Sequence, residues 1–498
     1  MVLVPYVLLQ AIVIPLLASA LSVLVGKKLG PKMGWLTGGI LIYQTALLAL
    51  ACLDVWQGHV LIERYTWTSS PGVSLYLVAD GLSAPTALIM SLICTCLAFY
   101  SIDYVRYRVE VLYGRGEAGD TGSERCYAFY YALYPFFSVG LVGLALSWDI
   151  IMIWFFMEVP IIAFYFLIDL LGYEDRHKIA LLCALWFITA STLFMLGALM
   201  AYVELGDPSL SALPALVGKP LVRWACALMA LGLLVKAAVF GLHVWIPWVH
   251  ANTPTSLAGI LASYANMATY VLARTLVLPL PDILKTFSTP LMAWALLTMV
   301  YGALLTLAQD DVKRLCACST ISQISYSLLG VASLDRGAVA GGIFYMLSHC
   351  LGKAILFSTA GLIVYRTHER DIEHMGGLGR LMPKTAVLWA VGSMVLSAIP
   401  PLSGFQAEIA LFSTLFSSTT GDPMKLAIAI CGVLATALTA AYTFWPLKRI
   451  FMGSSRADLK SLREASASMF IPLIVLAVAS ALIGVWPGLI SELLSTAS

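Results

Sequence analysis

Apolar runs of membrane length dominate this chain. A bilayer core about 30 Å thick requires about 20 apolar residues in one helix. We count fourteen such runs in the 498 residues, at 3–25, 34–56, 78–104, 126–147, 149–171, 180–203, 222–246, 255–280, 289–308, 313–334, 338–364, 384–412, 424–447 and 468–490. No stretch between them is long enough for a soluble domain. The sequence therefore predicts an all-α, polytopic membrane protein with about fourteen transmembrane helices.

Composition excludes several other classes of protein. Apolar residues make up 60% of the chain and charged residues 11%, against about 25% charged in soluble domains. A net charge of +2 offers no basic surface for nucleic acid. We find no phosphate-binding loop, flavin, haem or iron–sulfur motif. The closely spaced Cys316 and Cys318 are better explained by packing than by a metal site. We therefore expect no cofactor, no metal ion and no redox centre in this chain.

Basic residues indicate how the chain is oriented. Loops after odd-numbered runs carry twenty of the 29 Lys and Arg residues, and loops after even-numbered runs carry six. The remaining three, Lys236, Arg274 and Lys353, lie within runs. Positively charged loops stay on the cytoplasmic side. We therefore expect cytoplasmic odd loops, both termini on the outer side, and an inner or plasma membrane as the location.

Six ionisable side chains fall inside apolar runs, where each costs about 2.5–3.5 kcal/mol on insertion scales. They are Glu158, Lys236, His243, His349, Lys353 and Glu408. Each therefore needs a partner or a function. An ion pair is the least costly way to hold Glu158 and Lys236 together. Such a pair could be a static bridge or a switch that depends on protonation, and the sequence leaves both open.

The histidines extend this set. His243 follows Lys236 by seven residues, a spacing that predicts one shared helix face, and His250 follows near the end of the run. His349 and Lys353 are four residues apart and so lie on one side of a helix. Two basic groups one turn apart in lipid are difficult to explain as packing. We therefore favour a hydrated path through the interior, with Glu408 as a further isolated carboxylate in run 384–412.

Prolines interrupt two of the runs. Run 222–246 leads into WIPWVHANTPTS, which contains Pro247 and Pro254, and Pro400 and Pro401 lie in run 384–412. Proline removes a helical hydrogen bond, and broken backbone at membrane depth is tolerated only where it lines a cavity. The two breaks are five runs apart, which predicts two inverted five-helix repeats. Alternatively, these are ordinary membrane prolines.

The repeats would divide the chain into four parts. We expect three N-terminal helices in residues 1–125, helices 4–8 as the first repeat in 126–280, helices 9–13 as the second repeat in 289–447, and a C-terminal helix in 448–498. Helices 7 and 12 would be the broken ones. Because five is an odd number, the two repeats would cross the membrane in opposite directions.

Several of these stretches resemble one family in the family's order. They are WFFMEVPIIAFYFLI, LLVKAAVFGLHVWIPWVHANTPTSLAGILA, YGALLTLAQDDVKRLCACSTISQISY, MLSHCLGKAILF, YRTHERDIEHMGGLGRLMP and PPLSGFQAEIALF, from about residue 126 to 415. They are similar to the antiporter-like subunits of respiratory complex I (the NADH:quinone oxidoreductase chain M or chain 4 type), of Mrp antiporters and of membrane-bound hydrogenases. The resemblance implies a fourteen-helix, proton-translocating subunit.

The resemblance also implies roles for particular residues. Glu158 and Lys236 match the family's coupled pair, His349 and Lys353 match the motif of helix 11, and Glu408 matches the exit-side group of broken helix 12. Two positions depart from the family: Asn266 stands where most members have a Lys in helix 8, and Gln323 stands where a His is found in helix 10. These amides can hold water but cannot titrate. Either His243 takes over, the path is altered, or pumping is weaker.

The resulting leading hypothesis is a proton-translocating subunit driven by electron transfer in partner subunits. Its partners would be other membrane-arm subunits of a complex I-like assembly and the lipid bilayer. Two alternatives stay open, an Mrp-type Na⁺/H⁺ antiporter subunit and a structural membrane-arm subunit with reduced pumping. All three hypotheses use the same ionisable residues, with His250, Asn266 and Gln323 as supporting residues of the site. These residues therefore do not distinguish between the hypotheses.

Overall fold

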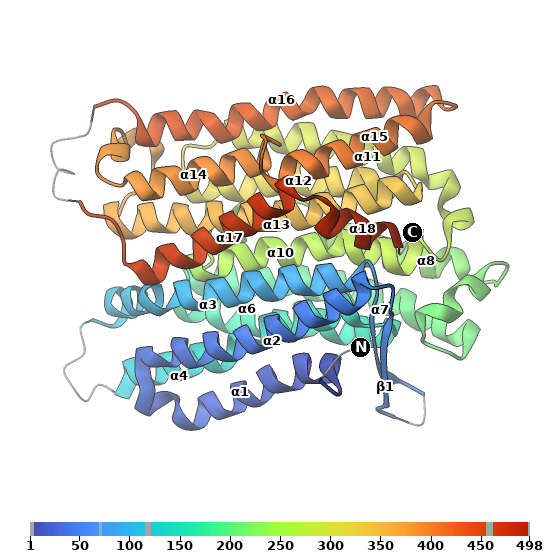
Figure 1. Cartoon of the computed structure of the whole chain (residues 1–498), viewed down its shortest axis with the longest axis horizontal. Coiled ribbons are helices and arrows are strands. Elements are labelled where there is room, and N and C mark those ends of the chain that lie inside the picture. Colours follow the sequence, from blue (N-terminus) through green and yellow to red (C-terminus); the bar gives the residue numbers. More distant parts are fainter. Residues whose placement is uncertain (1–3, 69–71, 115–120, 455–461, 497–498) are drawn as a thin grey trace.

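The computed structural model is a bundle of helices that run approximately parallel to one another (Figure 1). It describes residues 4–68, 72–114, 121–454 and 462–496. Within these ranges, eleven helical segments are long and apolar enough to cross a membrane. One of them, Val7–Trp56, contains two helices in succession. The expected polytopic, helical membrane fold is therefore confirmed.

The N-terminal part contains a feature that the sequence analysis missed. Helices α1 (Val7–Leu29), α2 (Met33–Trp56) and α3 (Ser83–Tyr113) are joined by a short turn and by an antiparallel hairpin of strands β1 (Leu61–Thr66) and β2 (Ser74–Ala79). The predicted start of the third helix at residue 78 was therefore wrong, because residues 78 and 79 belong to β2. Glu63 in β1 accepts hydrogen bonds from the N–H groups of Leu8 and Leu9, both at 2.9 Å. The hairpin thereby satisfies donors in the first turn of α1.

Two groups of helices follow, and each has one interrupted member. The first group comprises α4 (Thr121–Leu133), α5 (Pro135–Leu146), α6 (Ile150–Leu171), α7 (Arg176–Leu205), α8 (Val222–Lys236), α9 (Ile246–Asn252) and α10 (Thr255–Leu272). The second comprises α11 (Pro281–Leu307), α12 (Val312–Ala332), α13 (Arg336–Thr367), α14 (Pro383–Leu396), α15 (Ser403–Thr419) and α16 (Pro423–Phe451). The chain continues through α17 (Ala467–Val485) and α18 (Gly488–Thr496).

Both predicted breaks occur; the second contains Pro400 and Pro401 as expected, whereas the first lies ahead of Pro247 and Pro254. The first separates α8 from α9, and the second separates α14 from α15. Pro247 lies in the first turn of α9 and Pro254 caps the start of α10, positions where the missing N–H of proline costs nothing. Each break also contains an alanine in the left-handed region, Ala238 with φ of 53° and Ala398 with φ of 51°.

The two groups also share capping details at a constant spacing. Ala238 and Ala398 are 160 residues apart, and so are the N-cap residues Asp175 of α7 and Asp335 of α13. Isolated β-bridges join Asp149 to Ser209 in the first group and Asp311 to Asp371 in the second. The aspartate at the start of each bridge accepts N–H bonds from the first turn of its helix, α6 or α12, as capping aspartates do.

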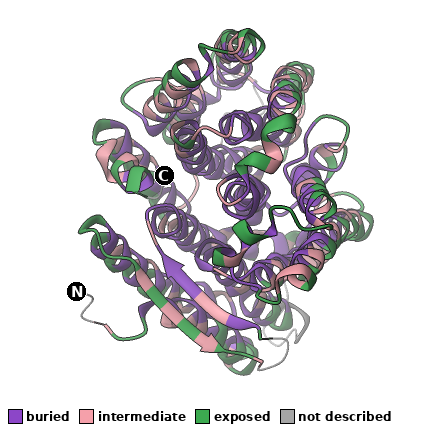
Figure 2. Cartoon of the chain, turned by 90° about the vertical axis from the view of Figure 1, so that its right-hand side faces the viewer, coloured by how far each residue is buried: buried purple, intermediate pink, exposed green. Residues whose placement is uncertain are grey.

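Burial separates an inner from an outer set of helices (Figure 2). All residues in the most apolar stretches of α10, α12 and α13 are buried, whereas 28% are buried in that of α16. A helix buried on every side can carry polar side chains toward neighbouring helices rather than toward lipid. Both termini lie toward one end of the bundle in Figure 1. Three cations counted for the orientation, Arg115, Arg456 and Lys460, lie outside the described residues.

Candidate functional site

Buried polar side chains form a series through the inner helices. All nine residues expected from the sequence lie on α6, α8 to α10, α12, α13 and α15, or in the first break. Lys236, His250, Asn266, Gln323, His349 and Lys353 are no more than 2% exposed. Glu158 and Glu408 are half-buried. The series therefore runs from the first group of helices into the second.

Lys236 ends α8 and is held by an aromatic ring. Its Nζ lies 3.6 Å from the ring centroid of Tyr264 on α10 and 5.9 Å from that of Phe187 on α7. Glu158 on α6 interacts electrostatically with both Lys236 and Tyr264. In the part of the chain that the structure describes, Glu158 and Lys236 form no ion pair within 4.0 Å. The expected direct pair is replaced by a cation–π contact, with the carboxylate nearby.

His243 occupies the first break rather than a helix. Because α8 ends at Lys236, the prediction that the two residues share one helix face was wrong. The N–H of Gly241 donates to Nδ1 of His243 at 3.2 Å. The ring lies 4.8 Å, centroid to centroid, from that of Tyr301 on α11. His243 is thus a buried ring in the loop of the break.

Asn266 and His349 join the two groups of helices. The amide Nδ2 of Asn266 on α10 donates to the carbonyl of Ala262 at 2.8 Å. Its Oδ1 is therefore the atom that faces Nδ1 of His349 on α13, at 3.0 Å. An amide oxygen only accepts, so Nδ1 of His349 carries the proton of this bond. Nε2 of His349 is buried with no hydrogen-bond partner among the described residues.

Lys353 lies one turn beyond His349 on α13. Its Nζ donates to the carbonyl of Cys316 at 2.9 Å and to the hydroxyl of Ser319, both on α12. His250 on α9 interacts electrostatically with Lys353 and His349. Within the described ranges, neither ring nitrogen of His250 has a hydrogen-bond partner. Buried polar atoms of this kind are usually satisfied by internal water.

Gln323 on α12 organises a cluster of hydroxyl groups. Its Nε2 donates to the hydroxyl of Tyr442 at 2.7 Å, and the hydroxyl of Tyr345 donates to its Oε1 at 2.8 Å. The hydroxyl groups of Tyr326 and Thr439 are 2.8 Å apart in the same cluster. Both ends of the Gln323 amide are thereby satisfied, and hydroxyl groups continue the polar series beyond it.

Glu408 lies on α15, beside this cluster. It interacts electrostatically with Tyr326, Tyr345 and Tyr442, and with the hydroxyl of Thr436. The arrangement places a half-buried carboxylate beside the hydroxyl cluster, in the second group of helices. Taken together, the acid, base, amide and hydroxyl groups can hold protons and water along one series.

The aromatic members of the site were not predicted from the sequence. Tyr264, Tyr326 and Tyr345 lie in apolar runs, where tyrosine is an ordinary packing residue, and no spacing marks them as functional. Lys313, which was counted in the loop after the ninth run, is fully buried at the start of α12. The only sequence feature that indicated the burial of Lys313 was its position at the start of run 313–334.

A family model and two relatives match most of this chain. Residues 147–439 match the family model described as "NADH:quinone oxidoreductase/Mrp antiporter, TM". NAD(P)H-quinone oxidoreductase chain 4 1 of a Nostoc species is 29% identical over 506 residues, covering 97% of this chain and 88% of the relative. Chain 4-3 of the same species is 30% identical over 464 residues, covering 89% of this chain and 77% of the relative.

Solved structures share the fold over nearly the whole chain. A chain of the Mrp complex from a Dietzia species aligns with a TM-score of 0.86 and 22% identity, covering 99% of this chain and 97% of its own. A chain of respiratory complex I from Thermus thermophilus aligns with a TM-score of 0.82 and 21% identity, covering 99% of this chain and 100% of its own. At these identities the likeness concerns the fold.

Proposed function

Because this chain belongs to the NADH:quinone oxidoreductase/Mrp antiporter transmembrane family, we propose that it translocates protons as an antiporter-like subunit of a complex I-like membrane assembly. One observation carries the proposal: the buried polar series from Lys236 to Glu408 crosses between the two groups of helices. Charged groups inside a membrane protein are costly unless they serve a pathway. The similarity to chain 4 relatives favours an assembly that reduces quinone.

In this proposal, Lys236 is the loading site and Glu158 sets its charge. A change of the electric field at Glu158, driven by electron transfer in a partner subunit, alters how strongly Lys236 holds its proton. The proton then moves by way of His349 and Lys353, with water at the unpaired ring nitrogens of His250 and His349. Asn266 and Gln323 do not titrate, but they orient a histidine and two tyrosines. The proton leaves past Glu408.

We also propose the arrangement of the chain in the membrane. Fourteen crossings result if α1 and α2 count separately, α4 with α5 forms one crossing, the pairs α8 with α9 and α14 with α15 each form one broken span, and the nine-residue α18 is not a crossing. The shared caps and left-handed alanines support two repeats within 126–280 and 289–447, flanked by 1–125 and 448–498. Loops after odd spans would face the cytoplasm, and both termini the outer side of an inner or plasma membrane.

The direct test is the Lys236→Ala variant in the assembled complex. We expect loss of coupled proton pumping, measured as acidification per electron transferred in vesicles. Lys425→Ala is the control, because Lys425 is a lysine outside the series that donates to Ser288 at 2.7 Å. Full pumping by Lys236→Ala would contradict the proposal.

Two further measurements address the alternatives. If the purified chain exchanged sodium for protons in vesicles without partners, a self-sufficient antiporter would replace the proposal. If neutralising Glu158, Lys236 and Lys353 together left pumping normal, the chain would be a structural membrane-arm subunit. We expect neither result, because each of the three residues belongs to the buried series.

A further inference from the structure

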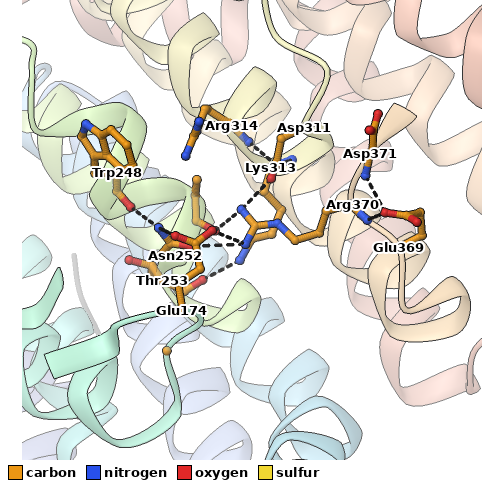
Figure 3. A network of polar contacts seen from close by, with 12 residues as sticks. Glu174, Trp248, Asn252, Thr253, Asp311, Lys313, Arg314, Glu369, Arg370 and Asp371 are labelled. Carbon is orange, nitrogen blue, oxygen red and sulfur yellow. Dashed lines mark hydrogen bonds and ion pairs between the residues drawn. The ribbon is translucent and has the colours of Figure 1, made fainter. Parts of the chain in front are cut away.

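A group of charged side chains gathers where the loops after α6, α11 and α13 approach α9 (Figure 3). It includes Glu174 after α6, Asp311 before α12 and Arg370 after α13. None of these residues belongs to the proton path proposed above. We use the name α9 clamp for two of the cations that reach the C-terminal end of α9, Arg370 and Lys313.

Arg370 contacts three elements at once. Its Nη2 lies 2.8 Å from Oδ2 of Asp311. Its Nη1 donates to Oδ1 of Asn252, the last residue of α9, at 3.2 Å and lies 3.3 Å from Oε1 of Glu174. Asn252 in turn donates from Nδ2 to Oε2 of Glu174 at 3.2 Å. Arg370 therefore ties the end of α9 to both groups of helices.

Lys313 contacts the same helix end. It is fully buried, and its Nζ donates to the carbonyl of Thr253, the C-cap residue of α9, at 2.8 Å. The same Nζ lies 3.9 Å from the ring centroid of Tyr173. Within the described residues, no carboxylate oxygen lies within 4.0 Å of this Nζ. The charge of a buried lysine is thus directed at a helix C-terminus, where the backbone carries partial negative charge.

Helix α9 depends on such contacts for its position. It has seven residues, well below the 12–15 or so at which an isolated helix becomes even marginally stable. The break before it removes the support of α8. The two clamp cations act on its last residues, the positions where cations stabilise a helix.

What α9 positions is His250. Its ring is fully buried, with centroid distances of 5.5 Å to Trp245 and 6.0 Å to Phe357. It lies two residues before Asn252, so a movement of the helix end would move the ring. Its neighbours across the helix interface are Lys353 and His349.

We infer that Arg370 and Lys313 are positioning residues that hold α9, keep His250 beside Lys353 and His349, and close this end of the bundle to water. The inference rests on the proposed function for its consequence, since a displaced α9 would open a leak into the proton path. Its structural part, the restraint of α9, is independent of translocation.

The test compares Arg370→Gln with wild type in the complete complex in native membranes. We expect amide hydrogen exchange in residues 246–252 to rise by about tenfold or more, as for the loss of charge-assisted hydrogen bonds. Protons pumped per electron should fall, while electron transfer per assembled complex is retained. Arg449→Gln is the matched control, because Arg449 pairs with Asp310 at 2.8 Å and Glu373 at 3.5 Å rather than with α9.

Two further variants keep the test decisive if Arg370→Gln fails to assemble. Lys313→Met should loosen the same helix, and Arg370→Lys should give an intermediate effect because a lysine replaces one contact but not the planar fork. Exchange in α9 equal to that of Arg449→Gln in all three variants would overturn the inference. Faster exchange with an unchanged proton-to-electron ratio would confirm the restraint of α9 but overturn its role in closing the proton path to water. A different combination of results would separate the two proposals. Full pumping by Lys236→Ala would contradict the proposed proton path, whereas faster hydrogen exchange of α9 in Arg370→Gln would still support the restraint of α9.

Discussion

The amide of Asn266 determines which nitrogen of His349 carries a proton. Asn266 donates to Ala262 and therefore presents its oxygen, 3.0 Å away, to Nδ1 of His349. When the imidazole is neutral, its Nε2 is then an acceptor, buried and without a hydrogen-bond partner among the described residues. A proton arriving through water would bind at Nε2. An uncharged amide thereby contributes to a proton path by orienting a group that titrates.

Asn266→Leu should accordingly impair translocation without removing a titratable group. The leucine leaves the Nδ1 donor of His349 buried and unpaired, at a cost of about 1–3 kcal/mol, and releases the choice of tautomer. We expect proton pumping per electron to fall several-fold in vesicles that contain equal amounts of assembled complex. Pumping equal to wild type would show that the Asn266–His349 bond has no part in the path.

The ring of Tyr264 should matter more than its hydroxyl. Lys236 Nζ lies 3.6 Å from the ring centroid, and a desolvated cation–π contact contributes about 2 kcal/mol. Tyr264→Leu removes the ring and should lower the pumping rate about tenfold. Tyr264→Phe keeps the ring and removes only the hydroxyl that donates to Met157, so it should retain most of the activity. Equal losses in the two variants would assign the effect to the hydroxyl instead.

Acid should selectively weaken the contact between Asp80 and Arg274. Arg274 Nη2 lies 2.5 Å from Asp80 Oδ2, with 7% and 14% of the two side chains exposed. Burial raises the pKa of Asp80, but Arg274 and the N–H of Ser83 outweigh it and lower that pKa below its usual value. Because the folded pKa is lowered, the stabilisation is complete above the unfolded value of about 3.9 and is lost as the pH falls through the folded value.

Thermal unfolding of the purified complex as a function of pH measures this effect. Asp80→Asn should be less stable than wild type near neutral pH by about 3–5 kcal/mol, because it leaves Arg274 buried without its counter-ion. The difference between wild type and variant should shrink as the pH falls below about 4. A difference that stays constant down to the lowest pH would exclude ionisation of Asp80 as its cause.

The second break should tolerate no side chain at Gly404. A Cβ at this position in the first turn of α15 would lie 1.8 Å from the carbonyl oxygen of Val395 in α14. Overpacking costs about 1–3 kcal/mol and occasionally more, so Gly404→Ala should lower the melting temperature and the yield of assembled complex. Gly421→Ala is the control, because its added Cβ meets nothing within 4 Å. Normal stability of Gly404→Ala would show that α14 and α15 can separate at little cost.

The fold class could be predicted from the sequence because lipid acts on each segment separately. A run of about 20 apolar residues must form a helix that satisfies its own backbone, and this holds without knowledge of its neighbours. The same locality made the two breaks and the buried ionisable residues visible. The β-hairpin could not be predicted in this way. Strand Leu61–Thr66 is stabilised by hydrogen bonds to a second segment, Ser74–Ala79, and not by the residues of the strand alone.

The contacts between side chains could not be predicted from the sequence, because they also depend on other segments of the chain. The expected ion pair of Glu158 with Lys236 and the shared face of Lys236 with His243 both assumed geometry that neighbouring chain segments decide. The end of α8 at Lys236 and the ring of Tyr264 from α10 changed both outcomes. Spacing along one helix predicts neighbours only while that helix continues.

The amino-acid sequence by itself determined that this chain is a helical membrane protein, where its helices break and which ionisable groups lie in apolar surroundings, because the cost of leaving water depends on each residue alone. Only the tertiary structure decided that Asn266 orients His349, that Gln323 joins Tyr345 to Tyr442, and that Arg370 and Lys313 hold α9. Those contacts join residues that are up to 119 positions apart, and which groups meet over such distances depends on how all the helices pack.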